Sequence, residues 1–269
     1  MTTAWVHPTS VVHAGATLGD GVQVGPFCLV GPDVVIGADS VLHSHVVVTG
    51  RTTIGRACGI HPFAVLGGAP QDRKYHGEPS DLIVGDEVVI REHVTVHRGT
   101  GGGEHRTAIG DRSLLMATCH VAHDCVVGHD VVMANGATLA GHVMVECHAV
   151  LGGFSAVGQM LRIGESAMLA AGAMVEQDAP PYCTVAGDRA KVRALNVVGL
   201  RRRGFDTETV SRIRSAFRIL FRSGLALDEA VAAVVERVVP RPPEVDHLLE
   251  FLGSSRRGVS RRRPRAASR

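Results

Sequence analysis

An aliphatic residue occupies every sixth position over the first quarter of this chain. The column comprises Val6, Val12, Leu18, Val24, Val30, Ile36, Leu42, Val48, Ile54, Ile60 and Leu66. Four positions further along each hexad, a second column from Ser10 to Ala64 holds only small or β-branched residues. A six-residue unit is too short for a pair of helices, so we predict a short strand followed by a tight turn. Three units would close a triangular coil of about 18 residues, and coils would stack at about 4.8 Å, the spacing of neighbouring strands.

The repeat continues at Val84, Ile90 and Val96, and again from Ile109 to Val175. Two stretches interrupt it, 68–82 and 97–108, and loops that leave a regular scaffold commonly carry binding residues. Glycine often follows the aliphatic residue, and we expect it to serve the backbone of the turn. With only 4% aromatic residues, the core must be aliphatic. We therefore predict an all-β domain over residues 1–187, a parallel β-helix of hexapeptide repeats.

Beyond about residue 188 the period of six is absent, and signals for helices replace it. Asp206 is a candidate N-cap for a helix that ends at Arg222, before Gly224. Prolines separate two further candidates, 227–239 and 244–252. We predict an α-helical C-terminal domain over residues 188–253 and a basic, disordered tail over residues 254–269. The last fourteen residues hold seven Arg and no acidic residue.

Composition argues against several classes of protein. The N-terminal segment lacks the pattern of a signal peptide, and no apolar stretch has the length of a membrane span. The six cysteines form no CxxC pair, and four of them occupy the small-residue column, which indicates small core residues. A cytoplasmic protein without membrane insertion is expected. The net charge is only +2 and its surplus lies in the tail, so nothing predicts a nucleic-acid partner.

Histidines cluster at one place in the repeat. His120, His123 and Asp124 lie close together in the chain, and His142 follows Asp124 by three hexads, which places it one coil above. An imidazole beside a carboxylate suits a general base near pH 7, because the acid fixes the tautomer and stabilises the imidazolium. A hydroxyl activated in this way can attack an acyl thioester without a Ser or Cys nucleophile.

The same residues allow other readings. A zinc-dependent hydratase of similar fold would hold its metal with three histidines across a subunit boundary. Histidines at surface turns can also be structural, so a non-catalytic β-helix scaffold is a third possibility. Our leading expectation has no metal at this site.

Several motifs outside the repeat carry a family resemblance that runs from about His7 to Gly258. They are 71–79 (Gln-Asp-Arg-Lys-Tyr-His-Gly-Glu-Pro), 95–100 (Thr-Val-His-Arg-Gly-Thr), 120–125 (His-Val-Ala-His-Asp-Cys), 137–143, 178–182 and 196–205. In these motifs the chain resembles the bacterial UDP-N-acetylglucosamine O-acyltransferases that begin lipid A synthesis. The resemblance implies a left-handed β-helix, a homotrimer with sites between subunits, and a 3-hydroxyacyl donor on the phosphopantetheine of acyl carrier protein. It implies no other cofactor.

The resemblance also implies roles for individual residues. His123 would be the general base for the glucosamine 3-hydroxyl, Asp124 would orient it, and the Gly141 amide would stabilise the oxyanion. The residues expected to contact the sugar, the nucleotide or the acyl chain are Asp72, Lys74, His97, His120, His142, Gln159, Ala171, Asn196, Arg202 and Arg203. The residues expected to bind the acidic carrier are Arg214, Arg218 and Arg222, whose spacing of four is equally typical of a solvated helix face.

Three positions depart from the family pattern. Gly158 replaces a His, Val198 replaces a Glu near the ribose, and Ala171 replaces a Gly at the floor of the acyl pocket. The first two leave open a related acceptor, such as a sugar with a 3-amino group. The third predicts a preference for shorter acyl chains, because one added methyl group shortens a rigid slot.

Overall fold

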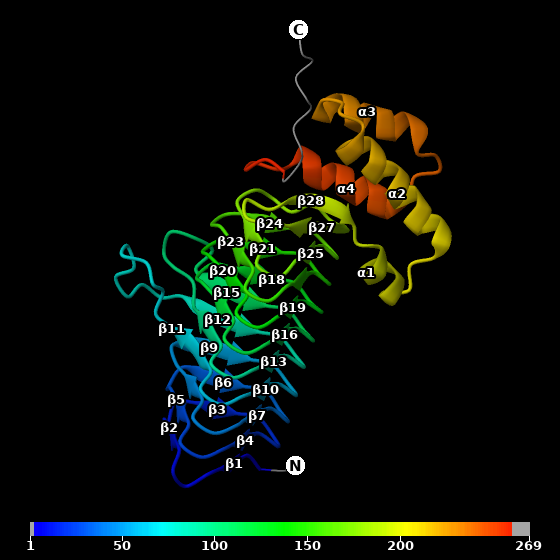
Figure 1. Ribbon diagram of the computed structural model, residues 1–269. Coiled ribbons are helices and arrows are strands. Elements are labelled where there is room, and N and C mark those ends of the chain that lie inside the picture. The colour runs from blue at the N-terminus through cyan, green and yellow to red at the C-terminus, as the bar shows by residue number, and fades with distance from the viewer. Residues whose placement is uncertain (1–2, 260–269) are drawn as a thin grey trace.

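Most of the chain winds into a left-handed parallel β-helix, capped at its C-terminal end by helices (Figure 1). This computed structural model describes residues 3–259. The strands form three sheets, and each coil contributes one strand to each sheet. The predicted architecture is therefore confirmed.

The first sheet contains β1 (Trp5–Val6), β4 (Gln23–Val24), β7 (Val41–Leu42), β10 (Gly59–Ile60), β13 (Val89–Ile90), β16 (Leu114–Leu115), β19 (Val132–Met133), β22 (Val150–Leu151), β25 (Met168–Leu169), β27 (Cys183–Ala186) and β28 (Lys191–Leu195). The second contains β2 (Val11–Val12), β5 (Leu29–Val30), β8 (Val47–Val48), β11 (Val65–Gly68), β14 (Thr95–His97), β17 (His120–Val121), β20 (Thr138–Leu139), β23 (Ala156–Val157) and β26 (Met174–Val175). The third contains β3 (Thr17–Leu18), β6 (Val34–Ile36), β9 (Arg51–Ile54), β12 (Asp81–Val84), β15 (Arg106–Ile109), β18 (Val126–Val127), β21 (Met144–Val145) and β24 (Arg162–Ile163).

Three edges run along the prism where the chain turns from one sheet to the next. The first edge joins the first and second sheets and includes 134–137, the second joins the second and third sheets and includes 122–125, and the third includes 128–131. At the third position of these turns the backbone adopts a left-handed conformation, as at Asp124 and His142, where φ is 57° and 60°.

Coil register is kept across both interruptions of the repeat, apart from a bulge between Leu66 and Gly68 where the first loop begins. Neighbouring strands normally pair at a spacing of three hexads, as Gln23 does with Val41. Val65 instead pairs with Thr95, and Thr95 pairs with His120. The first loop therefore adds the length of two hexads, and the second adds one hexad and a single further residue. Both loops leave the coil at the second edge, and the first stands out in cyan beside β11 (Figure 1).

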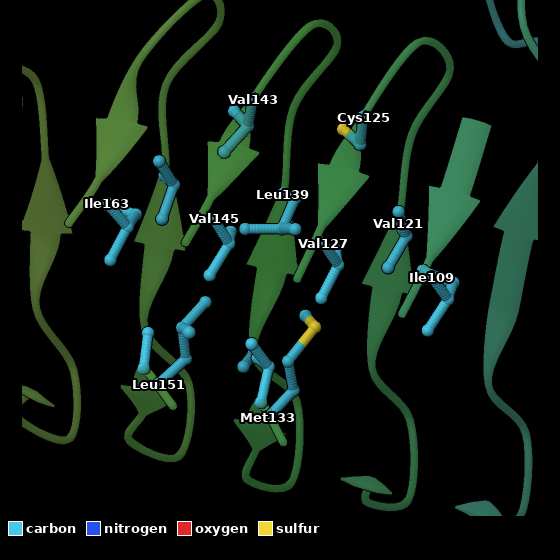
Figure 2. Packing of buried hydrophobic residues seen from close by; sticks show 14 of the residues in the cluster. Ile109, Val121, Cys125, Val127, Met133, Leu139, Val143, Val145, Leu151 and Ile163 are labelled. Carbon is cyan, nitrogen blue, oxygen red and sulfur yellow. The ribbon is translucent and has the colours of Figure 1, made fainter. Parts of the chain in front are cut away.

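The aliphatic column fills the interior of the prism. From Val24 onwards its members are buried, and Val30, Val48 and Leu139 have no exposed surface, as predicted. Figure 2 shows such residues from successive coils pointing into one continuous core. The small-residue column is buried from Val22 onwards, including Cys119. Because each interior layer repeats the layer below, the outer edges can vary without disturbing the core.

Gly67, which follows Leu66, has a φ of 71° and serves the turn backbone as expected, but other glycines that follow the aliphatic column serve a different purpose. Gly19, Gly37 and Gly55 have no positive φ. A Cβ at Gly37 would instead lie 2.6 Å from the carbonyl carbon of Gly55 in the next coil. Close stacking of coils, rather than turn conformation, therefore requires glycine here.

The C-terminal cap begins with an antiparallel hairpin of β27 and β28, which the sequence did not predict. Four helices follow, α1 (Val197–Arg202), α2 (Thr207–Arg222), α3 (Leu227–Arg237) and α4 (Pro243–Gly253). The carboxylate of Asp206 caps α2 by accepting from the Thr209 N–H at 2.8 Å, as predicted. Within residues 3–259 no helix is both long and apolar enough to cross a membrane.

The segment expected to begin a disordered tail lies against the β-helix. Val259 forms a parallel bridge with Asp178, and the Ser255 hydroxyl donates to the Asp178 carboxylate at 2.7 Å. The structure thus differs from the predicted boundary at residue 254. The rest of the predicted tail, 260–269, lies outside the described residues.

Candidate active site

His123 and Asp124 form a buried, hydrogen-bonded pair at the second edge. The Nδ1 atom of His123 lies 2.8 Å from Oδ2 of Asp124, and the exposed fractions of the two side chains are 9% and 0%. An ionised carboxylate only accepts hydrogen bonds, so Nδ1 carries the proton and Nε2 keeps its lone pair. The geometry leaves Nε2 as the basic atom.

The second loop holds Asp124 in place. Its carboxylate accepts from the Thr100 hydroxyl at 2.7 Å and from the Thr100 N–H, and its own N–H donates to the Thr107 hydroxyl. Burial opposes ionisation of Asp124, but hydrogen bonds from Thr100 and His123 lower its pKa below the ordinary value. Asp124 therefore stays charged and can stabilise an imidazolium at His123.

The next coil supplies Gly141 and His142. The His142 ring lies edge-to-face with the His123 ring at 5.0 Å, and its Nε2 is 3.9 Å from Oδ2 of Asp124. A Cβ at Gly141 would lie only 2.6 Å from Cε1 of His123, so glycine is required for the base to occupy its place. Within residues 3–259 the Gly141 N–H has no hydrogen-bond acceptor, which leaves it available to a substrate oxygen.

His97 and His120 lie on the neighbouring strands β14 and β17 of the second sheet. Their rings lie edge-to-face at 4.9 Å, and Nδ1 of His120 is 2.7 Å from the Thr95 hydroxyl. Burial lowers the pKa of His120, and burial followed by repulsion from His120 and His123 lowers the pKa of His97 to about 4. Both rings are neutral near pH 7. Nδ1 of His97 is buried without a hydrogen-bond partner among the described residues, so a polar group remains to be satisfied there.

A cavity of about 760 Å³ opens beside His142 and spreads over the outer face of the third sheet. Asp72 and Lys74 line it from the first loop, as the sequence predicted, and Met144 and Met160 give it an apolar wall. Other lining residues are Glu78, Thr100, Gly102, Glu146, Leu161, Arg162, Asp178, Ser254, Arg256 and Arg257. A charged entrance with an apolar wall suits a ligand that has a polar head and an aliphatic chain.

Contacts between the loops fix the first loop over this cavity. Arg98 donates to the Tyr75 hydroxyl at 2.8 Å and to the Gly67 carbonyl at 3.1 Å. Glu78 accepts from the His76 N–H and, less closely, from the Gly101 N–H of the second loop. The two interruptions of the repeat therefore form one structure above the His–Asp pair.

Other predicted site residues lie on different edges of the same chain. Gln159 is exposed on the second edge, one coil above Gly141, whereas Ala171 is exposed on the first edge. Asn196 caps α1 and donates to the Ser166 carbonyl at 2.9 Å, on the third edge. Arg203 hydrogen-bonds the Ser166 hydroxyl at 2.6 Å. One chain alone therefore does not bring Ala171, Asn196 and Arg203 to His123.

Arg202 is exposed at the end of α1, and within residues 3–259 it has no ion-pair partner. On α2, Arg214 and Arg218 are exposed, opposite a buried face that includes Phe217. Arg222 is also exposed, but it donates to the Arg193 carbonyl and lies over the Phe217 ring. Among the residues that the structure describes, Arg214 and Arg218 thus make no such contact.

Sequence reasoning missed the threonines that hold the cluster. Thr95 and Thr100 both lie in the motif 95–100, which was noticed only for its resemblance, and Thr107 lies in the interruption that follows. Their contacts depend on the path of the second loop, which the period of six does not specify.

A hexapeptide β-helix with a buried His–Asp pair beside a part-apolar cavity defines a hexapeptide-repeat transferase. Comparison with known proteins agrees. Residues 15–50 and 106–141 match the family model of bacterial transferase hexapeptides (six repeats), and residues 178–260 match that of Udp N-acetylglucosamine O-acyltransferase, domain 2.

Relatives narrow the class further. The chain is 49% identical to the acyl-(acyl-carrier-protein)–UDP-N-acetylglucosamine O-acyltransferase of Myxococcus xanthus, over 79% of this chain and 82% of the relative. Its counterpart in Thermodesulfovibrio yellowstonii is 46% identical over 82% and 85%. The solved structure of LpxA from Acinetobacter baumannii superposes with a TM-score of 0.92 at 38% identity, covering 95% of this chain and 99% of that one. The chain belongs to the UDP-N-acetylglucosamine O-acyltransferase family.

Proposed function

We propose that this protein transfers a 3-hydroxyacyl chain from acyl carrier protein to the 3-hydroxyl of UDP-N-acetylglucosamine, the first step of lipid A synthesis. The observation that carries the proposal is the buried His123–Asp124 pair, whose contact residues Thr100 and His142 line a cavity with a charged entrance and an apolar wall. The named relatives support the choice of substrates. The cytoplasmic location is also part of the proposal, and six free thiols are consistent with a reducing compartment.

Nε2 of His123 removes the proton of the acceptor hydroxyl as its oxygen attacks the thioester carbonyl carbon. Asp124 stabilises the resulting imidazolium, and the free N–H of Gly141 donates to the oxyanion. When the carbon–sulfur bond breaks, the imidazolium returns its proton to the phosphopantetheine thiolate. The products are the O-acylated sugar nucleotide and the free carrier thiol, and His123 is neutral again.

We propose further that the working site is shared between subunits of a homotrimer. Asp72, Lys74, His123 and His142 gather at the second edge, whereas Ala171 lies on the first edge and Asn196 and Arg203 contact the third. A threefold axis parallel to the long axis of the β-helix would place the second edge of one subunit against another edge of its neighbour. In that arrangement Ala171, Asn196, Arg202 and Arg203 would complete the site from the adjacent chain.

The function is tested by replacing the base. His123→Ala should lower turnover by about 10²–10⁴, the usual contribution of a general base. His7→Ala is the control, because His7 follows β1 in the first coil and does not line the cavity. Steady-state kinetics with UDP-N-acetylglucosamine and 3-hydroxyacyl carriers would measure both. Turnover of His123→Ala within a few-fold of the parent would contradict the proposal.

The main alternative concerns the identity of the acceptor sugar. A sugar with a 3-amino group would react by the same steps, and Gly158 and Val198 depart from the family pattern on the nucleotide side. Parallel assays with the 3-hydroxy and 3-amino sugars decide between them, and we expect the 3-hydroxy sugar to be preferred.

A further inference from the structure

A second His–Asp–His cluster lies on the third edge, one hexad after the catalytic one. His129, Asp130 and His148 repeat the spacing of His123, Asp124 and His142. Nδ1 of His129 is 2.7 Å from Oδ2 of Asp130, and Nδ1 of His148 is 3.8 Å from the same oxygen. The two rings lie edge-to-face at 4.9 Å.

This second cluster lacks what an acyl-transfer site needs. Cys147 stands where the catalytic coil has Gly141, so the close approach that glycine permits is absent. None of the three residues lines the cavity beside His142. The cluster is also more open, with exposed side-chain fractions of 45%, 30% and 26% for His129, Asp130 and His148. Three potential ligands at an accessible surface instead suit a dissolved ion.

The spacing of the donor atoms matches a tetrahedral ion. One donor atom from each residue lies within 4.8 Å of the other two. Bonds of about 2.0–2.2 Å to imidazole nitrogen and carboxylate oxygen place tetrahedral ligands about 3.3 Å apart. The separations of 2.7 and 3.8 Å from Oδ2 of Asp130 lie on either side of that value. Small rotations of the two rings would therefore complete the geometry.

We propose that His129, Asp130 and His148 bind one divalent transition-metal ion of the zinc class, with water at the fourth position. Two imidazoles and one carboxylate favour zinc, cobalt or nickel over magnesium or calcium, which prefer oxygen ligands. His129 binds through Nδ1 once its proton resides on Nε2, so this ring changes tautomer without losing a proton.

Charge at the cluster agrees with this assignment. Asp130 forms an ion pair with Arg112, so the cluster offers a carboxylate charge to a divalent cation. Nε of Arg112 donates to Oδ1 of Asp130 at 3.0 Å, so it can hold the carboxylate while Oδ2 turns to the ion. Arg112 is half exposed, and its second contact with Oδ2 can be released into water.

The catalytic cluster is a poorer metal site despite its similar spacing. Asp124 is fully buried, and the hydroxyl and N–H of Thr100 hold its carboxylate together with His123. A metal there would have to displace buried donors that cannot reach water. The two clusters therefore supply matched variants within one chain.

The experiment titrates the purified, metal-free full-length protein with Zn²⁺ by calorimetry, and with Co²⁺ by visible absorption. We expect about one ion per chain and the intense bands of a four-coordinate Co²⁺ site. Loss of a residue that only hydrogen-bonds to a metal ligand lowers metal affinity about 10–100-fold. His148→Gln and Asp130→Asn remove ligands themselves, so each should lower the affinity by more than about 100-fold. Arg112→Gln should lower it by about 10–100-fold.

His142→Gln is the matched control, because it removes the equivalent residue of the catalytic cluster, and it should bind the ion as the parent does. Circular dichroism would establish that each variant keeps its β-helix. No binding by the parent would overturn the proposal. Binding that survives His148→Gln but is lost in His142→Gln would also overturn it, by placing the ion at the catalytic cluster.

Discussion

His123 occupies space that a side chain at position 141 would fill. An added Cβ would lie 2.6 Å from Cε1 and 2.7 Å from Nε2 of His123, distances that real atoms do not tolerate. A Cβ at residue 141 would displace the ring even if its hydrogen bond to Asp124 survived, as the bond between His129 and Asp130 does beside Cys147. The position of the His123 ring thus depends on the lack of a Cβ at Gly141 in the next coil.

Gly141→Ala should therefore lower activity without unfolding the β-helix. A displacement of about 1 Å can cost on the order of 100-fold in rate, so we expect a turnover loss of that size. Gly59→Ala is the control, because a Cβ there would meet nothing within 4 Å. Steady-state kinetics of both variants tests the point, and equal activity in the two would contradict it.

His97 predicts a dependence of stability on pH. Burial lowers its pKa to about 4, whereas an unfolded chain has an ordinary pKa of 6.5. As pH falls from about 6.5 to 4, the unfolded chain takes up a proton that the folded chain refuses, so folding becomes less favourable. The full difference is on the order of 3 kcal/mol and is complete below pH 4.

His97→Gln should lose less stability than the parent across this window, because glutamine does not titrate. Urea unfolding at several pH values measures the difference between the two free energies of unfolding. That difference should change between pH 6.5 and 4 and stay constant above pH 7.5. A constant difference throughout would show that His97 is accessible to protons in the folded chain.

At the scale of elements, α2 presents arginines to solvent along one face. Arg214 and Arg218 are exposed, and the opposite face packs into the cap through residues such as Ile213 and Leu220. A basic face on a firmly packed helix suits an acidic partner whose approach is guided by charge.

Arg218→Glu should raise the KM for the acyl carrier on the order of tenfold at low salt, and the effect should shrink as salt screens it. The KM for the nucleotide sugar should not change. Arg237→Glu, which reverses an exposed charge on α3, is the control. If both variants have the KM of the parent, the face of α2 is only solvated.

The elements differ in how well the sequence predicts them. The coils follow from the column of aliphatic residues because each strand turns one such residue inward, and α2 follows from Asp206 and its apolar period. The hairpin of β27 and β28 could not be predicted, because its sequence has neither the period of six of the coils nor the apolar period of a helix. The short helix α1 is less than two turns long, too short for a periodic pattern.

The residues of the candidate site also differ in how well the sequence predicts them. His123, Asp124 and His142 could be placed from spacing alone, because three hexads make one coil. The role of Thr100 could not, because it reaches Asp124 from a loop whose path no repeat defines. The second cluster has the same spacing as the first, and only the structure shows its openness.

At the scale of the whole molecule, the predicted contacts are spread over three edges of one prism. If neighbouring subunits share the site, two variants that are each impaired at low nucleotide-sugar concentration should complement each other. His123→Ala removes the base from one side, and Arg202→Ala weakens nucleotide binding from the other.

Co-expression of the two variants with different tags would give mixed trimers. With random assembly, about a quarter of the sites would contain both intact residues, so roughly that share of activity should return at low nucleotide-sugar concentration. Mixtures of separately assembled trimers are the control and should stay inactive. No recovery in the mixed trimers would mean that each chain builds its site alone.

The two loops that interrupt the repeat have a consequence for divergence. Neither adds a whole coil, and the second does not even add a whole number of hexads, yet the strands on either side still pair in register. Each loop leaves and returns at the same edge, so its length does not change how the coils stack. Descendants of such a chain are free to lengthen, shorten or exchange these segments, and so to acquire new acceptors, while inheriting an unaltered scaffold.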